Sequence, residues 1–180
     1  MQKKIQFMEK IGLFYGPAKG STEKVAEKVT EQIGKEKVDL ISVKDATAED
    51  LKKYQNIIFG VSTIGKETWD GYNTANDWDK FRAELDKVDF AGRTVAMFSL
   101  GDHITYPKHF VDALGWLAEY LKPRNAKLIG YVDTKNYEFE ESQGIEGDKF
   151  MGLPIDEDYE AHLTDDRIKT WLEDILPKFK

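Results

Sequence analysis

The sequence contains no cysteine. This absence excludes disulfide bonds, thiol catalysis, iron–sulfur clusters and cysteine-ligated zinc. It fits a reducing compartment, and we expect a cytoplasmic location. Histidine is also scarce: His103, His109 and His162 are the only three, and none has the spacing of a metal-binding motif such as H-E-x-x-H. We therefore expect no metal site.

Positive charge and long apolar runs are also in short supply. Lysine and arginine number 26 against 33 acidic residues, which gives a net charge of −7. Nucleic-acid binding needs a basic face, so we expect no such partner, whereas an acidic surface is compatible with docking onto basic proteins. No apolar run approaches the roughly 20 residues that span a bilayer, and the basic N-terminus lacks the apolar stretch of a secretory signal. We expect no membrane partner.

The length of 180 residues predicts one domain over 1–180. Residues 1–9 are expected to form a short extension ahead of the first strand. Met1 and Met8 both remain open as the native start.

Apolar runs alternate with amphipathic segments along the chain. Strands are predicted over 10–15, 38–43, 57–61, 94–100 and 127–132, and helices over 22–33, 48–54, 76–85, 110–121 and 164–176. Thr164 is the expected N-cap of the last helix. Because the strands are nearly continuous apolar runs, the pattern predicts an α/β fold with a parallel sheet covered by helices on both faces. An acidic stretch over 135–158 interrupts the fifth unit.

In such sheets ligands bind beyond the carboxyl ends of the strands, where the strand order reverses. Three loops qualify: the first loop (16–21), the second loop (62–75) and the third loop (101–108). The first loop is rich in small residues and enters a helix, where unpaired amides and the helix dipole favour a phosphate. It matches neither the Walker motif nor G-x-G-x-x-G. The second loop offers hydroxyls and aromatics, and Tyr106 in the third could stack on a flat ring or pack in the core.

Several motifs together resemble a long-chain flavodoxin, over about residues 9–179. They include Ile11-Gly12-Leu13-Phe14-Tyr15-Gly16, Gly20-x-Thr22-Glu23-Lys24-Val25-Ala26, Asp77-Trp78-Asp79-Lys80-Phe81, Gly101-Asp102-x-x-x-Tyr106-Pro107 and Phe150-Met151-Gly152-Leu153-Pro154-Ile155-Asp156. The resemblance implies a flavodoxin-like three-layer sandwich with strand order 2-1-3-4-5. It also implies that the acidic stretch is the extra loop that splits the fifth strand in long-chain members.

The resemblance further implies a low-potential one-electron carrier, not an enzyme, with non-covalent FMN that cycles between semiquinone and hydroquinone. The residues that it assigns to the FMN phosphate are Gly16, Pro17, Ala18, Lys19, Gly20, Ser21 and Thr22. Those that it assigns to the ribityl chain and ring are Ser62, Thr63, Ile64, Gly65, Trp69, Ser99, Leu100, Gly101, Asp102 and Tyr106. Tyr106 would stack on the outer face of the ring, and Gly65 would let a peptide turn toward it.

Two loops depart from the family pattern. Pro17 has no N–H to donate, and Lys19 stands where members usually carry a hydroxyl. Lys19 either contacts the phosphate as a charged donor or points to solvent. The second loop is extended and has Ile64 where members have tryptophan, so either Trp69 or Ile64 covers the inner face of the ring.

Redox proteins are the partners that the resemblance implies, such as ferredoxin/flavodoxin-NADP reductase or pyruvate oxidoreductase. They would dock on the acidic surface of a monomer. One alternative is a flavin-dependent NAD(P)H or quinone reductase on the same fold. Another is a binding module that has lost FMN and binds a different anion.

Overall fold

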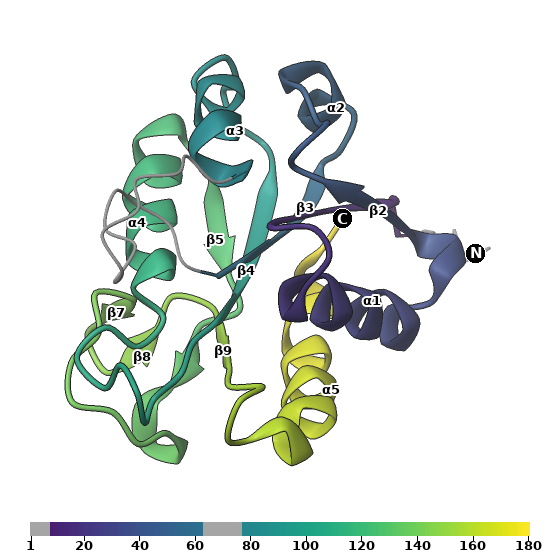
Figure 1. The fold of residues 1–180 in the computed structure, drawn as a ribbon. Coiled ribbons are helices and arrows are strands. Elements are labelled where there is room, and N and C mark those ends of the chain that lie inside the picture. Colours follow the sequence, from purple (N-terminus) through teal and green to yellow (C-terminus); the bar gives the residue numbers. More distant parts are fainter. Residues whose placement is uncertain (1–7, 63–76) are drawn as a thin grey trace.

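The fold is a parallel sheet between two layers of helices (Figure 1). The computed structural model describes residues 8–62 and 77–180. The main elements are β1 (Ile11–Tyr15), α1 (Ser21–Ile33), β2 (Val38–Ser42), α2 (Ala48–Lys52), β3 (Asn56–Val61), α3 (Asp77–Leu85), β4 (Thr94–Leu100), α4 (Asp112–Leu121), β5 (Lys127–Ile129), β9 (Leu153–Ile155) and α5 (Thr164–Ile175). The strand order is β2-β1-β3-β4-β5, all parallel, as expected.

Alternate residues of the strands enter two separate cores, because successive side chains of a strand point to opposite faces. In β3, Ile57 and Phe59 pack with α2, α3 and α4 on one face. Ile58 packs with α1 and α5 on the other. Both faces are therefore buried, which explains the nearly continuous apolar runs.

The predicted fifth strand is shorter than expected. β5 ends at Ile129, because Gly130 takes a left-handed conformation with φ of 81°. β5 pairs with the first half of β4, and β9 pairs in parallel with the second half, from Phe98 to Leu100. The interruption therefore spans residues 130–152, not 135–158, and we call it the insertion. It contains a small antiparallel sheet in the order β6 (Val132–Asp133), β8 (Lys149–Phe150), β7 (Ile145–Glu146).

The start of α4 and the N-cap of α5 differ from the prediction. α4 begins at Asp112 and not at 110, because Val111 before it has a left-handed φ of 50°. The N-cap of α5 is Leu163, and Thr164 is already helical because a 3₁₀ turn over Ala161–Leu163 leads directly into the helix. The hydroxyl of Thr164 donates instead to Glu157.

The amino end of the sheet is fastened by the fully buried Asn56, at the start of β3. Its side-chain amide donates to the carbonyls of Glu9 and Lys180 and accepts from the Lys180 amide. Glu9, which falls in the expected extension, also donates its N–H to the Lys180 carbonyl at 2.7 Å. None of the described helices has both the length and the apolar character needed to cross a membrane.

The insertion packs tightly against α4. A Cβ placed on Gly115, in the middle of that helix, would lie 2.1 Å from the Gln143 carbonyl oxygen. The Gln143 N–H in turn donates to the Asp112 carboxylate at 2.8 Å. Beside this contact the insertion buries Phe150 against Phe110. The close approach therefore depends on the missing side chain of Gly115.

We predict that Gly115→Ala destabilises the apoprotein by about 1–2 kcal/mol in urea unfolding, because the methyl group must push the insertion away. On helix propensity alone the same change would stabilise the protein by roughly 0.5–1 kcal/mol. The sign of the measured change therefore shows whether tight packing or helix propensity dominates. Glu119→Ala, at an exposed position of the same helix, is the control and should change little. A gain in stability for Gly115→Ala would contradict the tight packing.

Candidate functional site

The first, second and third loops leave the sheet at the same edge. β1 ends at Tyr15, which pairs with Gly60 of β3, and Val61 pairs with Ser99 of β4. The Gly16 amide donates to the Gly60 carbonyl and continues the ladder by one step. The described parts of the three loops therefore start at one edge of the sheet, as predicted.

Gly16 starts the first loop in a space that excludes any side chain. A Cβ there would lie 2.5 Å from Val43 Cγ2. The carbonyl oxygen of Gly16 accepts a hydrogen bond from the buried indole N–H of Trp78 at 3.1 Å. The start of α3 thereby holds the start of the loop in place. Pro17 follows and is exposed.

Two amides of the first loop already have carboxylate partners, so the expectation that its amides are unpaired is wrong for them. The Lys19 N–H donates to Glu23 Oε2 at 2.8 Å. The Ala18 N–H reaches Asp77 Oδ2 at 3.5 Å, a long contact. These acceptors are present because α1 brings Glu23 back over the loop and α3 starts with an aspartate beside it.

The beginning of α1 keeps its donors available. Within residues 8–62 and 77–180, the N–H groups of Gly20, Ser21 and Thr22 have no recorded acceptor, and the Gly20 N-cap makes no side-chain hydrogen bond. A Cβ placed on Gly20 meets no heavy atom of the described residues within 4 Å, so among these residues there is room beside the amides. Three amides, the Ser21 hydroxyl and the helix dipole fit a phosphate group. Thr22 is buried.

Glu23, in the first turn of α1, is an acidic residue that contacts the first loop. The Tyr15 hydroxyl, at 2.6 Å, and the Lys19 amide donate to it and lower the pKa of its carboxyl, and the Lys19 charge acts in the same direction. Burial and this bond to Glu23 raise the pKa of Tyr15 to about 12. Lys19 itself is exposed and has a left-handed φ of 64°. The positive charge of its ammonium group favours the ionised form of Glu23 at the start of α1.

Most of the predicted second-loop residues fall outside the described part of the chain. Ser62 is described, half-buried, directly after β3. Thr63, Ile64, Gly65 and Trp69 lie outside the described residues. The choice between Trp69 and Ile64 for the inner face of the ring stays a prediction.

The third loop is tied to itself by Asp102. Its Oδ1 accepts the N–H groups of Ile104 and Thr105, and its carbonyl accepts that of Tyr106. Tyr106 lies at the surface with 39% of its area exposed. Gly101 is packed closely under Val111 and Phe110. The loop thus presents a tyrosine ring beyond the strand end, as predicted.

The last two residues of β4, Ser99 and Leu100, differ in how much of their surface is exposed at this edge. Ser99 is fully buried, and its hydroxyl donates to the Leu100 carbonyl. Leu100 is half-buried. Of these two residues, only Leu100 has exposed surface to offer a ligand.

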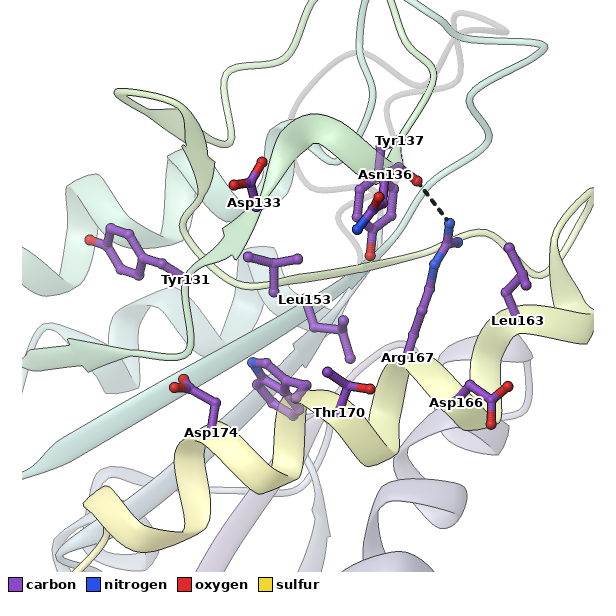
Figure 2. Close-up of a pocket in the computed structure, with 12 residues that line it drawn as sticks. Tyr131, Asp133, Asn136, Tyr137, Leu153, Leu163, Asp166, Arg167, Thr170 and Asp174 are labelled. Carbon is purple, nitrogen blue, oxygen red and sulfur yellow. Dashed lines mark hydrogen bonds between the residues drawn. The ribbon is translucent and has the colours of Figure 1, made fainter.

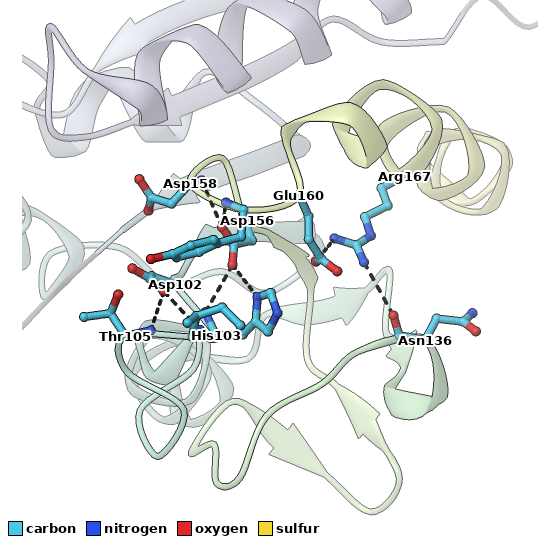
Figure 3. A network of polar contacts seen from close by, with 10 residues as sticks. Asp102, His103, Thr105, Asn136, Asp156, Asp158, Glu160 and Arg167 are labelled. Atoms are coloured by element: carbon cyan, nitrogen blue, oxygen red, sulfur yellow. Dashed lines mark hydrogen bonds and ion pairs between the residues drawn. The ribbon is translucent and has the colours of Figure 1, made fainter.

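A fourth segment at the same edge was missed by the sequence reasoning. β9 runs parallel to the end of β4, so residues 156–160 emerge beside the third loop, and the Gly101 N–H donates to the Ile155 carbonyl. Asp156 and His103 meet here, with Nδ1 and Oδ2 2.5 Å apart (Figure 3). The signal in the sequence was the short apolar run Leu153-Pro154-Ile155 before the acidic residues.

The comparisons with known proteins agree on one family. A family model described as Flavodoxin matches residues 13–171. A flavodoxin from Nostoc sp. is 43% identical over 171 residues, which cover 95% of this chain and 98% of that protein. Flavodoxin 1 of Azotobacter vinelandii is 39% identical, over 94% of this chain and 99% of that protein. The chain belongs to the flavodoxin family.

The solved structures give the same result. A Fusobacterium nucleatum flavodoxin bound to flavin mononucleotide has a TM-score of 0.85 at 27% identity, and the match covers 96% of this chain and all of that one. The predictions of a flavodoxin fold, FMN as cofactor, and an electron carrier rather than an enzyme are confirmed. The partners of this flavodoxin are redox proteins.

Negative charge gathers where the third loop meets residues 156–160. Burial, together with the nearby charges of Asp102, Asp156 and Glu157, raises the pKa of Asp158. Four carboxyl groups of this flavodoxin therefore lie close enough to influence one another at one edge of the sheet.

A separate cavity of about 500 Å³ lies between α5 and the insertion (Figure 2). Its lining includes Tyr131, Tyr137, Leu153, Arg167 and Trp171. None of the predicted site residues that the structure describes contributes to it. The cavity and the loop edge of this flavodoxin are therefore two separate places in the fold.

We predict that Gly20→Ala weakens FMN binding at least tenfold, because the methyl group would fill the room beside the three available amides. The fold should tolerate the change, since the Gly20 φ of −151° is open to alanine. The loss of unfolding free energy should stay under about 1 kcal/mol, the cost of a poorer N-cap. Titration of the apoprotein with FMN, followed by quenching of flavin fluorescence, measures the affinity. Wild-type affinity would rule out a phosphate at this position.

Proposed function

We propose that this flavodoxin holds FMN with its phosphate at residues 16–22 and its ring beside the third loop, and works as a one-electron carrier of low potential. The available amides of Gly20, Ser21 and Thr22 support the phosphate position. The exposed ring of Tyr106 supports the ring position. When bound, FMN supplies the group that takes up and releases single electrons.

The crowding of carboxylates is the observation that carries the proposal of low potential. Reduction adds negative charge to the ring site, and Asp102, Asp156, Glu157 and Asp158 oppose it there. Burial raises the pKa of Asp158 most, and the charges of Asp102, Asp156 and Glu157 raise it further. A cofactor beside these carboxylates would face the repulsion of their charges, and a net charge of −7 adds to the effect.

A titration with a graded reductant tests the proposal, and we expect two separate one-electron steps. We predict that Asp158→Asn raises the more negative midpoint potential by on the order of 20 mV, since one negative charge is removed from a water-exposed edge. Glu119→Gln, which removes an exposed charge from α4, is the control and should leave it unchanged. A single two-electron step, or equal shifts in both variants, would contradict the proposal.

Lys19 contributes to phosphate binding by offsetting the charge of Glu23. Its backbone N–H donates to Glu23, and its charge acts in the direction that lowers the pKa of that carboxyl. Without this cation the Glu23 carboxylate would repel a phosphate at the helix start more strongly.

We predict that Lys19→Ala weakens FMN binding about threefold at low ionic strength, the scale of an exposed ion pair. The difference from wild type should shrink as salt is added, because salt screens exposed charges. Lys35→Ala, near the other end of α1, is the matched control. Equal affinities of Lys19→Ala and wild type at low ionic strength would exclude the role.

We further propose that the redox partners dock through basic surfaces onto this acidic edge. A ferredoxin/flavodoxin-NADP reductase and a pyruvate oxidoreductase are partners of this kind, and Tyr106 and Tyr159 offer exposed rings for the contact. We also propose that the chain is a monomer and forms one domain, and the contacts of Asn56 with Glu9 and Lys180 support the single domain. The lack of cysteine supports a cytoplasmic location.

A further inference from the structure

The third loop is fastened to the fold by its contact with Asp156. This carboxylate accepts the backbone N–H of His103 at 3.1 Å and approaches its ring nitrogen Nδ1 at 2.5 Å. Its other oxygen accepts the N–H groups of Asp158 and Tyr159, both at 2.9 Å. One side chain therefore joins the third loop to the turn after β9, 53 residues along the chain.

Asp156 is fully buried, and its charge is compensated by these donors. Burial alone raises the pKa of the carboxyl, but the Tyr159 amide, the ring and amide of His103 and the Asp158 amide outweigh it and hold the pKa below the usual value. A buried carboxylate that loses a donor becomes costly. His103, with a side chain only 9% exposed, supplies the one side-chain donor among them.

The described groups around His103 come from several elements. Glu160 has a carboxylate oxygen within 4.8 Å of both the His103 ring and Asp156. The rings of Phe110 and Tyr159 pack edge-on against the imidazole, each at 6.2 Å. Arg167 of α5 binds Glu160 at 2.7 Å and reaches the Asn136 carbonyl of the insertion. Figure 3 shows the contacts of Asp156 with His103 and, beside them, those of Arg167 with Glu160 and Asn136.

His103, Asp156 and Glu160 are of residue types that can bind a metal ion, but their contacts do not indicate a metal site. Both oxygens of Asp156 already accept hydrogen bonds, and Glu160 is paired with Arg167. The guanidinium of Arg167 lies 4.3 Å from the centre of the Tyr137 ring, which fixes that pair against the insertion. The carboxylates of Asp156 and Glu160 therefore already have hydrogen-bond partners within the protein.

We propose that His103 is a positioning residue of the FMN site. Through Nδ1 and its own amide it holds the third loop on Asp156, so that Asp102 and Tyr106 stand ready at the edge where the ring binds. The proposal rests on the proposed function, because it takes the third loop as part of the FMN site. The part of His103 that does the positioning is its ring donor, not its bulk.

Two substitutions separate the donor from the bulk. His103→Phe keeps a ring between Phe110 and Tyr159 but loses the donor to Asp156. His103→Asn loses the ring but places an amide N–H at the position of Nδ1. His162→Ala, at an exposed histidine outside the third loop, is the matched control.

We expect His103→Phe to bind FMN at least tenfold more weakly than wild type, and His103→Asn to bind within about threefold. The control should match wild type. Fluorescence titration of the apoproteins measures the affinities, and urea unfolding checks that each variant is folded. Wild-type affinity in His103→Phe, or a larger loss in His103→Asn than in His103→Phe, would overturn the proposal. Failure of wild type itself to bind FMN would instead overturn the proposed function.

A measurement on the unaltered protein covers the case in which a variant does not fold. Proton–nitrogen NMR of the His103 ring should show an Nδ1 proton that exchanges slowly with water, with and without FMN. The N–H groups of Ile104 and Thr105 should be protected from exchange before FMN is added, since the loop is already in place. A rapidly exchanging ring proton together with unprotected loop amides would overturn the proposal.

Discussion

Strand β4 pairs with two strands in succession along one edge, and the rest of the structure depends on that arrangement. β5 covers its first half and β9 its second, both in parallel. The chain must leave the sheet at Gly130 and return at Gly152, and both points are crowded. A Cβ would lie 2.6 Å from Trp171 Nε1 at the first and 2.3 Å from the Met97 carbonyl oxygen at the second. Glycine at each end lets the insertion leave and rejoin without opening the sheet.

The return of the chain through β9 gives the insertion a direct link to the functional edge. β9 ends level with β4, so Asp156 emerges beside Gly101. The Tyr137 hydroxyl of the insertion donates to the Pro154 carbonyl in β9, and Arg167 lies over the same ring. A displacement of the insertion would therefore also displace β9 and the third loop beside it. An extra segment far from the loops in sequence thus supports them in space.

The sheet could be predicted from the sequence because its strands are buried on both faces and read as apolar runs, so that β4 is found at its predicted bounds. The glycine-rich first loop could be placed because it lies between such a run and a helix. The strands β6, β7 and β8 could not, since two residues carry no periodicity. Neither could the contacts of Lys19 with Glu23 or of His103 with Asp156, because pairing of a polar group depends on backbone geometry that no local pattern encodes.

Asn56 ties Glu9 and Lys180 together at the start of β3, while the proposed FMN site lies beyond the ends of β1, β3 and β4. The six residues of β3 separate the two edges by roughly 17 Å at the rise of a strand. The contacts that fasten Glu9 and Lys180 and the proposed FMN site thus lie at opposite ends of β3. A tether to an electrode or a fusion partner joined at Lys180 would leave the whole exchange face turned outward to its reaction partners.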